Sequence, residues 1–124
     1  MLSVKIDEEH LIAILEPNGP LSESDFQPAV KAVDPLIEKY GRLNGIIINT
    51  KSFPGWESFA ALCSQLHFVK DHHKKVSRVA LVTDSLVGNF AKIVARHFVE
   101  AEIQLFPYQE YEKANKWIIG NAQN

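Results

Sequence analysis

The feature that most constrains this chain is an uninterrupted run of isoleucine at positions 46–48, between Gly45 and Asn49. A strand with one solvated face alternates apolar and polar residues, whereas a strand covered on both faces reads as a continuous apolar run. Isoleucine is also β-branched, which favours an extended backbone. The run therefore predicts a central strand that is buried on both sides, as is typical of α/β proteins.

Four more strands are predicted around this one. Val4 and Ile6 alternate with polar residues, and the polar stretch 7–10 suits a hairpin connection to the apolar residues 11–15. Residues 78–83 are apolar enough to form another buried strand. Residues 102–106 alternate cleanly, which predicts an edge strand with one wetter face.

The first helix is predicted between the second and third strands. Ser22 and Asp25 are spaced as in a capping box at its start, and Gly41 is suited to its end. Pro35 removes an interior hydrogen bond, so we expect it to kink or loosen the helix. The residues on its inward face are predicted to be Phe26, Val30, Val33, Ile37 and Tyr40.

Three further helices complete the pattern, at residues 56–73, after Asp84, and at residues 109–119. In the last of them Tyr111, Ala114 and Ile118 are predicted to face inward, with an ion pair between Glu112 and Lys116 outside. The element order is ββαβαβαβα. Right-handed crossovers convert this order into an α/β fold with a mixed sheet of about five strands and about four helices. At 124 residues the chain is expected to form a single domain, residues 1–124.

Composition narrows the classes of protein. Hydrophobic residues make up 46% and charged residues 23%, which are ordinary globular values, and no apolar run is long enough to cross a bilayer. The N-terminus alternates like a strand and lacks the pattern of a signal peptide. Thirteen basic against fifteen acidic residues create no global field for nucleic acid. We therefore expect a cytoplasmic protein, and the lone Cys63 agrees with a reducing compartment.

Three features resemble a known family: the strand at residues 45–49, the step from a strand to Asp84 before a helix containing Phe90, and the closing segment at residues 106–118. Over nearly its whole length the chain resembles the SpoIIAA-like family, which has a STAS-like α/β fold. Relatives in the wider STAS group are anti-sigma-factor antagonists, switched by phosphorylation of a serine at the start of the helix after the third strand. The SpoIIAA-like branch is similar in shape to lipid-binding folds, which implies small apolar ligands or membrane association.

The resemblance assigns the regulatory position to Ser58. The antagonists carry Asp-Ser-Ser-Gly at this helix start, whereas this chain reads Trp56-Glu57-Ser58-Phe59. A phosphate at a helix N-terminus is favoured by the helix dipole, but the neighbouring Glu57 would repel it. The ordinary interpretation is that Ser58 is a polar residue in the first turn of a helix.

The loop and helix at residues 53–69 carry more apolar surface than one helix face can bury against a sheet. The excess could be buried in the fold, in a second subunit, against a ligand, or in a membrane interface, where tryptophan is favoured. The predicted ligand- or membrane-binding residues, together with two from the following helix, are Phe53, Trp56, Phe59, Ala60, Cys63, Leu66, His67, Phe90 and Phe98.

A basic segment ends the same helix. Cations at a helix C-terminus ordinarily complement the helix dipole. Beside an exposed apolar helix, however, the same residues could contact phospholipid headgroups. The predicted headgroup-binding residues are Lys70, His73, Lys74 and Lys75.

The sequence offers little for catalysis. Cys63 and His67 share a helix face, but an apolar helix raises the pKa of a thiol rather than activating it, so a buried cysteine beside a partly buried histidine is favoured. We expect no metal site and no cofactor, because no further ligands follow at a recognisable spacing.

The leading hypothesis is therefore a non-catalytic protein that binds a small apolar or amphipathic molecule. It includes peripheral membrane contact and allows a homodimer, without nucleic acid as a partner. The alternative hypothesis is a protein-interaction switch of the anti-sigma-factor-antagonist type that acts through Ser58.

Overall fold

The computed structural model of the chain describes residues 2–18, 23–51, 76–84 and 102–122. The predicted strands and the first and last helices are confirmed within these ranges, whereas the helices predicted at 56–73 and after Asp84 lie outside them. In chain order the described elements are β1 (Leu2–Asp7), β2 (Ile12–Pro17), α1 (Glu23–Tyr40), β3 (Leu43–Asn49), β4 (Val76–Val82), β5 (Glu102–Phe106), the 3-10 turn η1 (Tyr108–Glu110) and α5 (Tyr111–Ala122).

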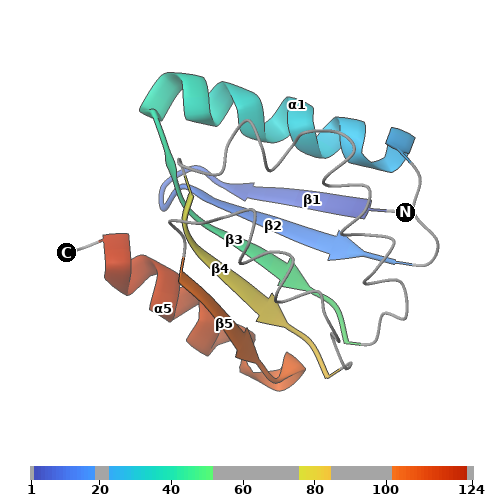
Figure 1. Cartoon of the computed structure of the whole chain (residues 1–124), viewed down its shortest axis with the longest axis vertical. Coiled ribbons are helices and arrows are strands. Elements are labelled where there is room, and N and C mark those ends of the chain that lie inside the picture. Colours follow the sequence, from blue (N-terminus) through green and yellow to red (C-terminus); the bar gives the residue numbers. More distant parts are fainter. Residues whose placement is uncertain (1, 19–22, 52–75, 85–101, 123–124) are drawn as a thin grey trace.

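The strands form one mixed sheet in the order β1-β2-β3-β4-β5. β1 runs antiparallel to β2, and the other three pairs are parallel, which confirms the predicted mixed α/β sheet. Helix α1 contacts β1 and β3, while α5 packs on β3, β4 and β5. The helix α1 therefore lies toward the β1 side of the sheet and α5 toward the β5 side, and both contact the central strand β3 (Figure 1). Because β2 to β5 are parallel, their carboxyl ends lie along one edge.

The prediction of a doubly covered central strand is correct. β3 lies in the middle of the five strands, and every residue from Leu43 to Ile48 is buried. On the face toward α5, Ile47 belongs to a cluster that spans four strands and the helix. The members of this cluster are Ile12, Ile47, Ala80, Val82, Phe106, Ala114 and Ile118.

Gly45 allows α5 to approach β3 closely. A Cβ atom at this position would lie 2.6 Å from Cγ2 and 2.7 Å from Cδ1 of Ile118, which is far inside the normal contact distance. The absence of a side chain at Gly45 therefore makes room for Ile118, the fully buried residue that joins the helix to the sheet.

Helix α1 departs from its prediction at Tyr40. Val33 and Ile37 are buried as predicted and Leu36 joins them, but Tyr40 is 42% exposed, because it is the last residue of the helix and turns its hydroxyl toward Glu8 in the β1–β2 turn. The helix continues through Pro35, whose ring is exposed, and the kink or loosening expected there stays a prediction. Gly41 ends the helix in the left-handed conformation, with φ of 78°, as predicted.

Helix α5 begins two residues later than predicted, after the short turn η1. Ala114 and Ile118 are buried as predicted, and Tyr111 is half-buried. The predicted ion pair between Glu112 and Lys116 is replaced by one across η1, where Lys113 Nζ lies 3.1 Å from Glu110 Oε1. No described helix is long and apolar enough to cross a membrane.

Candidate functional site

The residues predicted from the sequence to form a site lie outside the described residues. This applies to the whole ligand- or membrane-binding set, to Ser58, to the basic segment and to the pair Cys63 and His67. Their roles stay predictions. The same holds for Ser22, the predicted helix cap.

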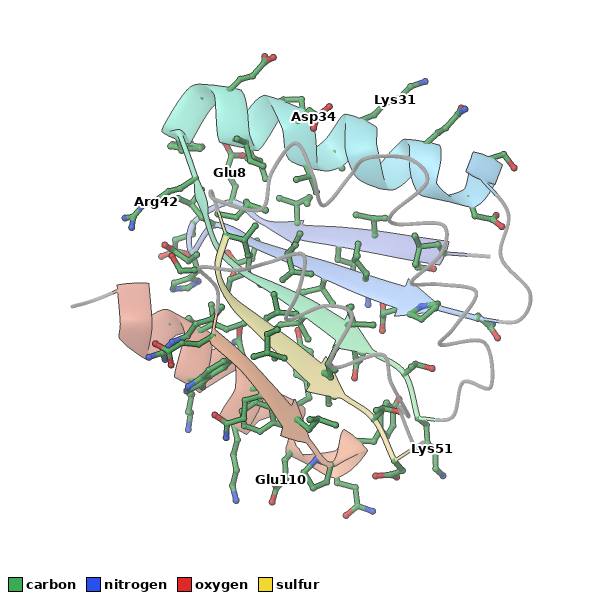
Figure 2. All side chains as sticks on the ribbon, viewed as in Figure 1. Glu8, Lys31, Asp34, Arg42, Lys51 and Glu110 are labelled. Carbon is green, nitrogen blue, oxygen red and sulfur yellow. The ribbon has the colours of Figure 1, made fainter. Side chains whose placement is uncertain are left out.

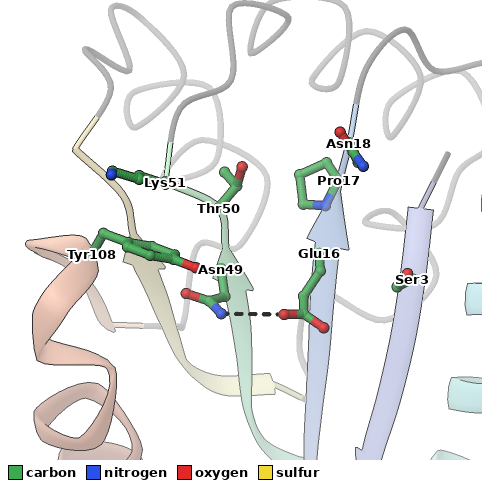
Figure 3. A pocket seen from close by; sticks show the side chains of 8 residues that line it. All are labelled: Ser3, Glu16, Pro17, Asn18, Asn49, Thr50, Lys51 and Tyr108. Atoms are coloured by element: carbon green, nitrogen blue, oxygen red, sulfur yellow. Dashed lines mark hydrogen bonds between the residues drawn. The ribbon is translucent and has the colours of Figure 1, made fainter.

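The described residues contain a cleft at the carboxyl edge of the sheet. It has a volume of about 440 Å³ and is open to solvent. Parallel α/β sheets place ligand sites at this edge, beyond the ends of their strands. The lining residues come from β1, β2, β3 and the η1 turn, and they are Ser3, Glu16, Pro17, Asn18, Asn49, Thr50, Lys51 and Tyr108 (Figure 3).

The floor of the cleft is formed by Glu16 of β2 and Asn49 of β3. The parallel register pairs Leu15 with Ile48, so the next residues along the two strands are neighbours on the face toward α5. Asn49 Nδ2 donates to Glu16 Oε2 at 3.3 Å (Figure 3). The other carboxylate oxygen of Glu16, Oε1, lies 3.1 Å from Nζ of Lys5. The carboxylate is therefore engaged on both oxygens.

This arrangement fixes the orientation of the Asn49 amide. An ionised carboxylate accepts hydrogen bonds and donates none, so the NH₂ group of Asn49 must face Glu16. The carbonyl oxygen Oδ1 consequently points the other way, where it is buried and has no hydrogen-bond partner among the described residues. An unsatisfied buried acceptor costs free energy. Among the described residues, Asn44 Oδ1 at the other end of β3 and Arg78 Nε are in the same state, so the fixed orientation of the Asn49 amide is what distinguishes the cleft.

Lys51 stands at the rim on a backbone that is tied to β4. Its carbonyl accepts from the N–H of Asp84 at 3.1 Å and from Thr83 Oγ1 at 3.4 Å, and the preceding Thr50 N–H donates to Val82 at 3.0 Å. The pairing of β3 with β4 thus extends beyond the strands. The side chain of Lys51 is exposed at this end of the sheet, opposite the end that carries Arg42 (Figure 2).

Tyr108 closes the cleft on the side of β5. Its N–H donates to Asp84 Oδ1 at 3.0 Å, which ties the start of η1 to the segment after β4. Thr83 N–H also donates to the carbonyl of Phe106 at 3.0 Å. The tyrosine is 36% exposed, so its ring and hydroxyl form part of the accessible wall.

Tyr111 lies near the Lys5–Glu16 pair. Burial raises the pKa of its phenol, and the Glu16 carboxylate raises it further, so the hydroxyl stays protonated at neutral pH. Its ring packs against the cluster under α5. Tyr111 therefore supports the sheet beneath the cleft instead of lining it.

The chain matches the model of one protein family. The SpoIIAA-like family model matches residues 12–119, from the second strand to the last helix. The chain belongs to the SpoIIAA-like family. Neither the curated proteins nor the solved structures include a match to it. The family expected from the sequence is thus confirmed together with the fold class.

The cleft of this SpoIIAA-like domain was not predicted from the sequence. A sequence signal for the cleft exists at the ends of the strands, where the polar residues Asn18, Thr50 and Asp84 follow β2, β3 and β4. Pairing between Glu16 and Asn49, by contrast, depends on the register of two strands distant in sequence. The predicted ligand-binding residues begin at Phe53, two positions after Lys51, which lines the cleft.

The chemistry that these residues offer is that of recognition. The cleft has one carboxylate that is already paired, one ammonium, an oriented amide and the hydroxyls of Ser3, Thr50 and Tyr108. No group of three or more metal-binding side chains occurs among the described residues. Hydrogen-bonding groups in a concave place of this size suit a small molecule with polar groups at its bound end.

Proposed function

We propose that this SpoIIAA-like domain is a non-catalytic binding protein for a small amphipathic molecule whose polar end occupies the cleft at the carboxyl edge. The observation that supports the proposal is the fixed floor of the cleft, where the Glu16 carboxylate, itself paired with Lys5, accepts from the Asn49 amide at 3.3 Å and sets its orientation. Fixed polar groups orient a ligand at low entropic cost, because little freedom is left to lose on binding.

The apolar part of the ligand is assigned to the residues predicted from the sequence. In the chain, Phe53 and Trp56 follow Lys51 closely, and Lys51 lines the cleft. A polar end held at Lys51 and an apolar end held by the following segment together describe an amphipathic molecule. Peripheral membrane contact and a cytoplasmic location belong to the same proposal, as does the single domain of residues 1–124.

Mass spectrometry under native conditions tests the proposal on the purified protein. A co-purified molecule is expected, and it should be lost or depleted in Trp56→Ala and in Asn49→Ala. Vesicle co-sedimentation of the same variants tests membrane contact. If the protein carries no molecule, binds no vesicle and gives no response to amphipathic probes at the amides around Glu16 and Asn49, the proposal is wrong.

Membership in the SpoIIAA-like family favours a second candidate, a protein-interaction switch of the anti-sigma-factor-antagonist type. Its regulatory residue would be Ser58. Pull-downs with wild-type protein and with Ser58→Asp test this function, with Ser52→Asp as a control that adds the same charge before the predicted helix. A switch requires that Ser58→Asp alone change the set of captured partners, and identical sets would exclude it.

A further inference from the structure

We infer that the polar end of the ligand is an anion, a carboxylate or a phosphate, and that Lys51 is the residue that binds it. This inference rests on the proposed function, because it names the chemistry of the group that enters the same cleft. Glu16 and Lys51 are the charged side chains that line it among the described residues. Their different surroundings decide which of the two charges is available to a ligand.

The negative charge of Glu16 is already matched. Oε1 lies 3.1 Å from the Lys5 ammonium, and Oε2 accepts the hydrogen bond from Asn49 at 3.3 Å. A cationic ligand would have to compete with Lys5 for the same carboxylate. The ammonium of Lys51, in contrast, makes no ion pair within the described part of the chain. The unmatched charge of the lining is therefore positive.

One further carboxylate lies close by. Asp84 does not line the cleft, and its Oδ1 accepts the N–H of Tyr108 at 3.0 Å. Asp84 and Lys51 meet through the main chain, where the N–H of Asp84 donates to the carbonyl of Lys51 at 3.1 Å. Asp84 thus fixes the backbone positions of both Lys51 and Tyr108, while the Lys51 ammonium stays available at the rim.

Hydroxyl donors complete the site. Ser3, Thr50 and Tyr108 line the cleft, and the hydroxyl group of each can donate a hydrogen bond to an anionic oxygen. The backbone under Thr50 and Lys51 is fixed by hydrogen bonds to the end of β4. A carboxylate or phosphate would therefore meet donors whose main chain is already in place.

Titration of the full chain with glycerol 3-phosphate, followed through backbone amide NMR shifts, tests this inference. We expect saturable shifts at residues 49–51 and 108. Lys51→Met should weaken binding about tenfold or more, because a charge-assisted hydrogen bond is lost, and Lys51→Arg should largely retain it. Lys31→Met is the matched control, because Lys31 is an exposed lysine on α1 that points away from the sheet (Figure 2).

A second variant tests the site without removing the lysine. Asn49→Asp has nearly the same shape but places a second carboxylate beside Glu16, so it should repel an anion and weaken binding of glycerol 3-phosphate as well. Unchanged affinity in both Lys51→Met and Asn49→Asp would overturn the inference. Urea denaturation of each variant confirms that the protein remains folded.

Two further probes distinguish a lipid headgroup from a free anion, and failure of the anion assignment from failure of the proposed function. Vesicles of phosphatidylcholine with and without phosphatidic acid show whether a lipid headgroup is bound, while glycerol 3-phosphate reports a free anion. Loss of either response in Lys51→Met supports the inference. Ethanolamine serves as the cationic probe. If ethanolamine shifts Glu16 and Asn49 while no anion binds, the anion assignment is wrong and the proposed function stands; if no probe and no co-purified molecule occupies the cleft, both are wrong.

Discussion

β3 carries an asparagine near each of its ends, and the two side chains have different partners and different exposure. At the amino end, Asn44 is only 5% exposed and its Nδ2 donates to the carbonyl of His10 at 2.6 Å, which ties β3 to the β1–β2 turn. At the carboxyl end, half-buried Asn49 donates to Glu16 at 3.3 Å and forms the floor of an open cleft. The same type of side chain therefore ties β3 to a turn at one end of the sheet and lines an open cleft at the other end.

The backbone around the two asparagines shows the same contrast. Leu11, at the amino end, adopts the left-handed conformation with φ of 56°, which is uncommon for a residue with a side chain. Its carbonyl accepts the N–H groups of Asn44 at 2.8 Å and Gly45 at 3.3 Å. The amino end is thus held by hydrogen bonds to the main chain of His10 and Leu11, whereas at the carboxyl end the side chains of Lys51 and Tyr108 stay exposed. We therefore expect substitutions to affect stability at the first end and binding at the second.

The largest effect is expected for Gly45→Ala. The new Cβ would lie 2.6 Å from Cγ2 of the fully buried Ile118, so α5 or the isoleucine must move. Overpacking of a core costs about 1–3 kcal/mol of unfolding free energy. Urea denaturation measures the loss, and adding Ile118→Val should restore part of it by removing the terminal methyl group.

Gly120→Ala is the matched control for this substitution. A Cβ at Gly120 has no atom within 4 Å, and the residue lies inside α5. Replacing an unstrained helical glycine with alanine should stabilise the protein by about 0.5–1 kcal/mol. Equal destabilisation in both variants would mean that close packing under Gly45 is not the cause.

The next effect separates the two asparagines directly. Asn44→Ala leaves the His10 carbonyl, in a partly buried contact, without its donor, which should cost about 1–3 kcal/mol. Asn49→Ala removes a longer hydrogen bond at a partly exposed site and should cost about 1 kcal/mol or less. Urea midpoints of the two variants provide the measurement. A larger loss for Asn49→Ala would reverse the comparison between the ends of the sheet.

Much of the fold could be predicted because local patterns determine it. The isoleucine run at 46–48 predicts the central strand, because a strand buried on both faces needs a continuous apolar run. Residues 102–106 form the predicted edge strand, but their burial does not follow the alternation, since Leu105 is 51% exposed and Phe106 is buried. Hydrophobic spacing predicts burial less well at the end of a helix, where the last residues extend beyond the sheet. Tyr40 fits the apolar face of α1 by spacing, yet it is the last residue of the helix and bonds to Glu8 instead.

The cleft could not be predicted in the same way, because its residues meet through tertiary structure. Glu16 and Asn49 become partners only when β2 and β3 align in their observed register, and Tyr108 reaches the site only because β5 lies beside β4. Neither fact is visible in a single stretch of sequence.

A smaller effect concerns pH at the amino end. Nδ1 of His10 lies 2.8 Å from Oδ2 of Asp7, and this hydrogen bond raises the pKa of the imidazole above its ordinary value of about 6.5, with the charges of Asp7 and Glu9 adding to it. The protonated form is favoured in the folded protein. The stabilisation is therefore fully present below about pH 6.5 and is lost as the pH rises through the folded pKa.

An NMR titration of the His10 ring measures this pKa. In Asp7→Asn the value should fall back toward the ordinary one, because the charged partner is removed. In Glu9→Gln it should fall much less, since Glu9 acts only through its charge. If the Asp7→Asn titration matches the wild type, the contact between His10 and Asp7 does not hold in solution.

The smallest effect is expected for Glu8→Gln, which removes a surface charge at the same end. Glu8 Oε1 accepts from the Tyr40 hydroxyl at 3.0 Å and lies 3.5 Å from Lys39 Nζ, and all three groups are exposed. Water screens such pairs and ordering long side chains offsets their attraction, so the urea midpoint should not change measurably. Glutamine also keeps an oxygen that can accept the Tyr40 hydroxyl. A clear loss of stability would show that surface charges, and not the buried amide of Asn44, hold the amino end closed.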